Sequence, residues 1–136
     1  MAPNTGPAQA AYSIVNILLL ESSFKREGQI DFQTVQQVVK VDFGSGKNEA
    51  TDELLVELLV VLTATQAEDA FAYEARVKMI GLFRKTGEGE LDEDFFMNQN
   101  APAIIFPFVR EHIASLCRQA ALNNVFLPPL NFTKRQ

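Results

Sequence analysis

The sequence contains no tryptophan, two tyrosines, one histidine and one cysteine among its 136 residues. A single cysteine, Cys117, cannot form an intrachain disulfide, so a reducing cytoplasm is the default expectation. Basic residues are also few, because 12 lysines and arginines face 17 acidic residues and leave a net charge of −5. Nucleic acids and anionic membranes select for basic patches, so this balance argues against both as partners.

Long hydrophobic runs are missing as well. No stretch approaches the roughly 18 apolar residues of a membrane span, so we expect no direct insertion into a membrane. Residues 1–11 are rich in alanine and proline and lack the positive charge of a secretory signal. We interpret them as a flexible tail before a single domain, for which a composition with 47% hydrophobic residues provides an ample core.

Residues suited to catalysis are few and poorly placed. His112 adjoins Glu111, but neighbouring helix positions point about 100° apart, so we interpret it as a surface or interface histidine. Cys117 falls on an apolar stripe and is expected in the core. One histidine, one cysteine and scattered carboxylates give no metal-ligand spacing, and the G-S-G-K run at Gly44 to Lys47 lacks the pattern of a phosphate loop. We therefore predict no enzymatic activity, no cofactor and no metal site.

One long helix is expected from Ala101 to Leu122, and the rest of the chain is organised around it. Pro102 suits a first helical turn, and Asn100 just before it is a candidate N-cap. Asn123 and Asn124 are candidates for the left-handed residue that ends many helices. Apolar residues recur at spacings of three and four along one side: Ile105, Val109, Ile113, Leu116, Cys117 and Ala120. One face of the helix must therefore be buried.

Four strand-like segments precede the helix, at residues 12–24, 35–43, 54–65 and 71–83. In the first, the alternation slips near Val15 and Asn16, which predicts a β-bulge. Gly44 to Asn48 is expected to turn the chain after the second segment. The third is apolar on both faces at its centre, which predicts a central strand covered on both sides. Gly81 predicts a bulge in the fourth.

These elements predict an α+β fold with a four-stranded antiparallel sheet and one long C-terminal helix. Such a two-layer chain leaves one sheet face and the all-round apolar helix start, residues 104–109, without cover. We therefore expect self-association.

The start of the helix carries the most specific pattern in the chain. Pro102 to Glu111 reads P-A-I-I-F-P-F-V-R-E, and Pro129 to Phe132 reads P-L-N-F. With V-K-V-D-F at Val39 to Phe43 and A-F-A-Y-E at Ala70 to Glu74, the chain resembles the SecB family of protein-export chaperones from Tyr12 to Phe132. The resemblance implies a domain over residues 12–132 and a short tail at 133–136.

The resemblance also implies a function. SecB-like chaperones are ATP-independent holdases that assemble as a dimer of dimers, keep preproteins unfolded and deliver them to the SecA motor. On this basis the client-binding groove is expected to contain Val39, Val41, Phe43, Phe106 and Phe108. The SecA-docking patch is expected to contain Glu21 and Glu74, although Lys25 stands where an acid is expected and Ala72 where a larger apolar residue is expected.

Two alternatives remain open at this point. The chain stops after Thr133 to Gln136, where the family usually continues with a second helix and an acidic tail. A SecB-like chaperone dedicated to one client, such as the antitoxin of a toxin–antitoxin pair, need not keep the SecA patch. An enzyme of the hot-dog type also wraps a sheet around a long helix, and it would need Glu111 and His112 as its acid/base pair.

Overall fold

The computed structural model of the chain describes residues 12–86, 92–122 and 127. Within them, four strands form one antiparallel sheet: β1 (Tyr12–Arg26), β2 (Gln36–Asn48), β3 (Glu53–Gln66) and β4 (Ala70–Lys85). A short helix, α2 (Glu93–Phe95), leads through a π-helical turn (Phe96–Asn100) into α3 (Ala101–Gln119). The predicted α+β fold with one long C-terminal helix is confirmed. The tails predicted at residues 1–11 and 133–136 lie outside the described residues.

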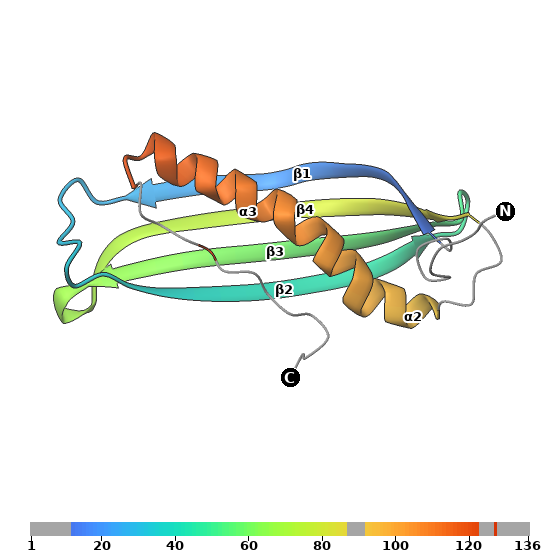
Figure 1. Ribbon diagram of the computed structural model, residues 1–136, viewed down its shortest axis with the longest axis horizontal. Helices are drawn as coiled ribbons and strands as arrows, with labels where there is room; N and C mark the ends of the chain where they lie inside the picture. Colours follow the sequence, from blue (N-terminus) through green and yellow to red (C-terminus); the bar gives the residue numbers. More distant parts are fainter. Residues whose placement is uncertain (1–11, 87–91, 123–126, 128–136) are drawn as a thin grey trace, which may run out of the picture.

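The sheet order is β1-β4-β3-β2, so β1 and β2 lie at opposite edges (Figure 1). β3 and β4 are joined by one short 3-10 turn, Ala67–Asp69, as the short linker between them predicts. α3 lies across one face of the sheet and runs diagonally from the β2 edge to the β1 edge (Figure 1). Because the crossing is diagonal, part of each edge strand is left beside the helix rather than beneath it.

The core lies between α3 and the two central strands. Ile105, Val109, Ile113 and Cys117 of the helix are fully buried, as their spacing predicts. Every second residue of β3 and β4 is buried against them: Leu54, Val56, Leu58, Val60, Leu62 and Ala64, with Tyr73, Ala75, Val77, Met79 and Phe83. Full burial of each large apolar side chain contributes about 1.5–3 kcal/mol. This layer therefore provides most of the hydrophobic stabilisation.

The opposite face of the sheet, here called the outer face, is not covered by any helix or strand within residues 12–86 and 92–122. β3 is a central strand, as expected, but Leu55, Leu59 and Val61 on its outer side are only half-buried. The expectation that β3 is covered on both faces is therefore wrong for the described part of the single chain. The apolar pattern on both faces is real, and the outer half of it remains in contact with solvent.

β1 contains the predicted bulge and one more. Its pairing with β4 passes from Ile14–Phe83 to Asn16–Leu82, so Val15 is the extra residue. A second irregularity between Leu19 and Glu21 was not predicted. Each bulge shifts by one residue the alternation of side chains between the two faces of the sheet. Because the two shifts cancel, Ile14 near the start of β1 and Phe24 near its end both face the helix.

Two predictions that rest on glycine are wrong. Gly44 to Asn48 does not turn the chain, because β2 continues through Gly44 and Gly46 to Asn48 and pairs with β3 throughout. The bulge predicted at Gly81 is also absent, since β4 pairs regularly there with β1 and β3. A Cβ atom on Gly81 would lie 2.9 Å from Cδ1 of Ile105. Glycine is needed at this position because the helix approaches the sheet closely.

The helical region begins earlier than expected. Asn100 has helical dihedral angles (φ −74°, ψ −47°) and makes no side-chain cap, so the N-cap prediction is wrong. The first helical residue is Glu93, after the extended Asp92. Phe96 anchors this entry, because its ring stacks on Tyr12 at 4.2 Å between centroids. Pro102 lies in the first turn of α3, as predicted.

The helix ends by a Schellman motif rather than at an asparagine. Ala121 has a φ of 61°, and the N–H of Leu122 donates to the carbonyl oxygen of Cys117 at 2.8 Å. Leu122 is buried, which gives the motif its usual apolar contact. Asn123 and Asn124 lie outside the described residues. Arg26, the last residue of β1, donates from Nη1 to the carbonyl oxygen of Ala120 at 2.5 Å and so ties this helix end to the edge strand.

Candidate functional site

Among the residues that the structure describes, the helix leaves two flanks of its sheet face uncovered, one over β2 and one over β1. On the β2 flank, Val39, Val41 and Phe43 share the helix-facing side and are half-buried. Their common orientation follows from their partners in β3, which are all fully buried: Leu62, Val60 and Leu58. The structure therefore brings together three of the predicted groove residues in one row.

Phe106 and Phe108 do not join that row as a pair. Phe106 is only 3% exposed and belongs to the core, with the guanidinium of Arg110 5.8 Å from its ring centre. Phe108 is 51% exposed and lies over β1, beside Ile17 and Leu19. Side chains two residues apart in an α-helix point about 200° apart around the helix axis. The rings of Phe106 and Phe108 therefore point to different flanks. We therefore leave Phe106 and Phe108 out of the β2-flank surface.

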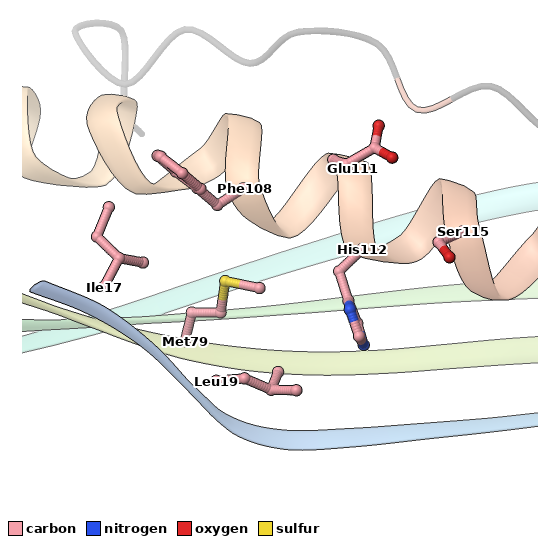
Figure 2. Close-up of a pocket in the computed structure, with 7 residues that line it drawn as sticks. All are labelled: Ile17, Leu19, Met79, Phe108, Glu111, His112 and Ser115. Atoms are coloured by element: carbon pink, nitrogen blue, oxygen red, sulfur yellow. The ribbon is translucent and has the colours of Figure 1, made fainter.

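The β1 flank holds an open pocket of about 420 Å³ (Figure 2). Its lining is apolar at the strands and at Phe108 and polar along the helix: Ile17, Leu19, Met79, Phe108, Glu111, His112 and Ser115. His112 points from the helix toward the strands, and its Nε2 lies 2.8 Å from Oγ of Ser22 in β1. The histidine thus links α3 to the edge strand.

The side chains of Glu111 and His112 point in different directions and contact different residues. Nη2 of Arg118 donates to the Glu111 carboxylate at 3.2 Å, and that carboxylate points away from the strands (Figure 2). Cys117 is buried, and burial raises the pKa of its thiol above the usual 9.0, which keeps it protonated as a core residue. Among the described residues, no group of three His, Cys, Asp or Glu side chains could hold a metal ion.

The predicted SecA-docking residues lie on the outer face, and each is matched by a basic residue. Glu21 accepts from Nε of Arg76 at 2.8 Å. Glu74 faces Lys25 directly across the β1–β4 pairing and also accepts from Oγ1 of Thr63 at 3.4 Å. The Glu21–Arg76 ion pair, together with Lys25 opposite Glu74, weakens the negative local field that an acidic patch needs.

The structure explains why position 72 holds alanine, where the family resemblance implies a larger apolar residue. It is the extra residue of a bulge in β4, where the pairing passes from Ala64–Tyr73 to Thr65–Phe71, and it is fully buried. A larger apolar side chain would not fit this buried position without rearrangement. Ala72 therefore contributes no exposed side chain to the outer face.

Several exposed apolar residues were missed by sequence reasoning. Phe32, in the connection before β2, is 58% exposed, and Val38 in β2 is 56% exposed. β1 carries a longer exposed set: Ile14, Val15, Leu18, Leu19 and Leu20. Val38 could have been found in the sequence, because it is the one apolar residue on the otherwise polar side of its strand. Phe32 lies outside any periodic segment and gives no such signal.

The fold and these surfaces define a small α+β protein with exposed apolar flanks, and comparison with known proteins identifies its family. Residues 7–134 match the family described as "Preprotein translocase subunit SecB". The protein-export protein SecB of Nitrosococcus oceani is 30% identical over 91% of this chain and 78% of its own length. That of Stenotrophomonas maltophilia is 28% identical over 94% of this chain and 74% of its own length.

A solved structure agrees in fold. The SecB-like chaperone of Mycobacterium tuberculosis, in complex with a peptide from an antitoxin, matches with a TM-score of 0.76. The match covers 92% of this chain and 94% of that one at 16% identity. This chain belongs to the SecB family, whose members are chaperones for protein export rather than enzymes. Within its described residues, no helix is long and apolar enough to cross a membrane.

Proposed function

We propose that this protein is an ATP-independent holdase of the cytoplasm that binds unfolded precursor proteins along the β2 flank of its helix. The observation that carries the proposal is the row of Val39, Val41 and Phe43, which share one side of β2 and are half-buried beside the core. Half-buried apolar side chains in a row beside a helix can bury the rest of their surface against a client.

Each such contact is weak. Full burial of a valine or phenylalanine side chain contributes about 1.5–3 kcal/mol, and a half-buried one would gain about 1 kcal/mol. Three contacts then sum to about 3 kcal/mol, below the roughly 4.1 kcal/mol that corresponds to a Kd of about 1 mM. Ordering a flexible client opposes binding further. Several grooves must therefore act on one client, which an oligomer would provide through effective concentration.

The β1 flank is proposed to supply that oligomer, a dimer of dimers. Phe108 and Leu19 line the β1-flank pocket, and Ile14 is exposed on the same side of the edge strand. A second copy seated on this flank would bury an apolar row that a single chain leaves in water. Client binding and assembly would then use different sides of α3.

The test separates the two flanks. Changing Val39, Val41 and Phe43 to alanine should reduce suppression of aggregation of an unfolded model protein, with the oligomeric mass unchanged. The matched control is alanine at Lys40 and Asp42, which lie on the outer face of the same strand and should have little effect. Circular dichroism confirms folding of each variant. Full activity of the triple variant would refute the assignment of the β2 flank.

Delivery of clients to SecA through Glu21 and Glu74 is the partner interaction proposed from the family resemblance. The second candidate is a chaperone dedicated to one client, and it is favoured by the ion pair of Glu21 with Arg76 and by the position of Lys25 opposite Glu74. A pull-down with SecA distinguishes the two. Retention of SecA that is lost in Glu21→Gln supports delivery, whereas no retention by the parent chain supports the dedicated chaperone.

A further inference from the structure

The chain has one histidine, His112, and its ring lies on the β1 flank between α3 and the edge strand. Nε2 of the imidazole is 2.8 Å from Oγ of Ser22, and the ring points from the helix toward the strands (Figure 2). Ser22 pairs with Val77 of β4, whose side chain is fully buried on the helix side, so Ser22 faces the helix as well. The hydrogen bond therefore holds the ring within the flank.

The surroundings of the ring are apolar on the strand side. The adjoining pocket is lined there by Ile17, Leu19 and Met79, and on the helix by Phe108. In the single chain His112 is half-buried, so water reaches the ring. A charge that is removed from water without a partner is costly. The positive form of the ring is therefore compatible with this flank only while the flank stays hydrated.

Within the described residues, the neighbouring carboxylates are directed elsewhere. Glu111 lines the same pocket, but its carboxylate points away from the strands and accepts from Nη2 of Arg118 (Figure 2). Glu21, the neighbour of Ser22 in β1, accepts from Nε of Arg76. Neither acid is placed to neutralise a protonated imidazole.

The cations of the neighbouring strands are also directed elsewhere. Arg26 of β1 donates to the carbonyl oxygen of Ala120, about 12 Å along the helix axis from His112. Lys78 of β4 pairs with Leu59 and so lies on the outer face. Histidine is the side chain whose charge ordinarily changes between about pH 5 and 8. Protonation of His112 would therefore place a new, unpaired charge on this flank.

We propose that His112 makes assembly on the β1 flank sensitive to pH, so that a second copy binds the flank while the imidazole is neutral and dissociates when it is protonated. This inference rests on the proposed assembly and adds its regulation. A second copy would remove water from the ring, and a two-fold pair would do so in both copies. Each imidazole must then be without its extra proton. The bond to Ser22 persists in the neutral form, because a neutral imidazole can pair with a hydroxyl as donor or acceptor.

The test is sedimentation velocity of the full chain at constant ionic strength and fixed protein concentrations, from about pH 7.5 to about pH 5.5, where histidine changes charge. The apparent dissociation constant should rise by about tenfold to a hundredfold, because each proton taken up changes it by up to about tenfold per pH unit. Circular dichroism at each pH checks that the chain stays folded. The NMR signal of the single imidazole should change over the same pH range as the assembled mass.

Three variants identify the group that responds. His112→Gln stays neutral at every pH and keeps a side chain that can pair with Ser22, so it should assemble equally at both ends of the range. His112→Leu is a second neutral variant, with an apolar side chain for the apolar pocket. The matched control is Glu111→Gln at the adjacent pocket position, which should respond to pH as the parent chain does.

The remaining outcomes separate this inference from the assembly on which it rests. A parent chain equally assembled at both ends of the range, or one whose imidazole becomes protonated while the oligomer persists, would overturn the pH response and leave assembly standing. The same holds if the neutral variants still dissociate in acid, if both fail to assemble, or if Glu111→Gln abolishes the response. A parent chain that stays a single copy at about pH 7.5 would reject the proposed assembly and this inference with it.

Discussion

α3 packs tightly on the sheet at Gly81, and replacing this glycine by alanine tests this packing directly. The new Cβ would lie 2.8 Å from Cε2 of Phe83 and 2.9 Å from Cδ1 of Ile105. Neither side chain can swing into solvent, because both are fully buried. Overpacking of this kind costs about 1–3 kcal/mol, and removal of a strand glycine returns roughly 0.5–1 kcal/mol.

We therefore expect Gly81→Ala to lower the free energy of unfolding by about 1–2 kcal/mol. The measurement is urea unfolding followed by circular dichroism at fixed protein concentration, because assembly would make the apparent stability concentration-dependent. Gly44→Ala and Gly46→Ala are matched controls in β2, where a new Cβ would meet nothing within 4 Å. These two variants should be as stable as the parent chain or slightly more stable.

A second variant tests whether Ile105 is the cause. Ile105→Val removes the Cδ1 atom and alone should cost about 0.5–1.5 kcal/mol. Combined with Gly81→Ala it should cost less than the sum of the two single changes, because one of the closest contacts of the added methyl group is then removed. Additive costs, or a Gly81→Ala variant as stable as the parent chain, would refute the close approach of helix and sheet.

Two further predictions concern the ends of the fold and its response to alkali. Arg26→Ala removes a charged hydrogen bond to the carbonyl oxygen of Ala120 and should lower the free energy of unfolding in urea by about 1.5–3 kcal/mol. The control is Lys25→Ala at the exposed neighbouring position, which should lower it little. Equal losses in the two variants would contradict the role of Arg26. Burial raises the pKa of Tyr12 and Tyr73 above 10.0, so the stability they contribute is complete below about pH 10 and is lost as pH rises through the folded-state values. Since the chain has no tryptophan, tyrosinate absorbance reports both groups, and its midpoint should be higher in the native than in the urea-unfolded protein; equal midpoints would contradict the burial of the phenols.

Much of the fold follows from local pattern. Alternation and three-to-four spacing predict the four strands and the apolar side of the helix, because burial of one face imposes these periods. The slip in alternation at Val15 predicts its bulge for the same reason. The signals at Gly44 and Gly81 were misread, since glycine marks a turn in one context and a close approach in another. Only the neighbouring helix or strand decides between them.

The candidate surfaces depended more strongly on the third dimension. Phe106 and Phe108 lie two residues apart in one apolar run, and the rotation of α3 on the sheet makes one a core residue and the other an exposed one. The pairing of β1 with β4 sets Arg76 beside Glu21 and Lys25 opposite Glu74. No local pattern reports these pairs, because their members are about 50 residues apart in the chain.

The sequence by itself determined the fold class and the family, because periodicity and motif are properties of neighbouring residues. The tertiary structure decided which apolar residues remain exposed, which acids are neutralised and which sheet edge keeps a regular backbone. Those properties depend on strand register and on the rotation of the helix over the sheet. Both are set by packing between segments that are distant in the chain.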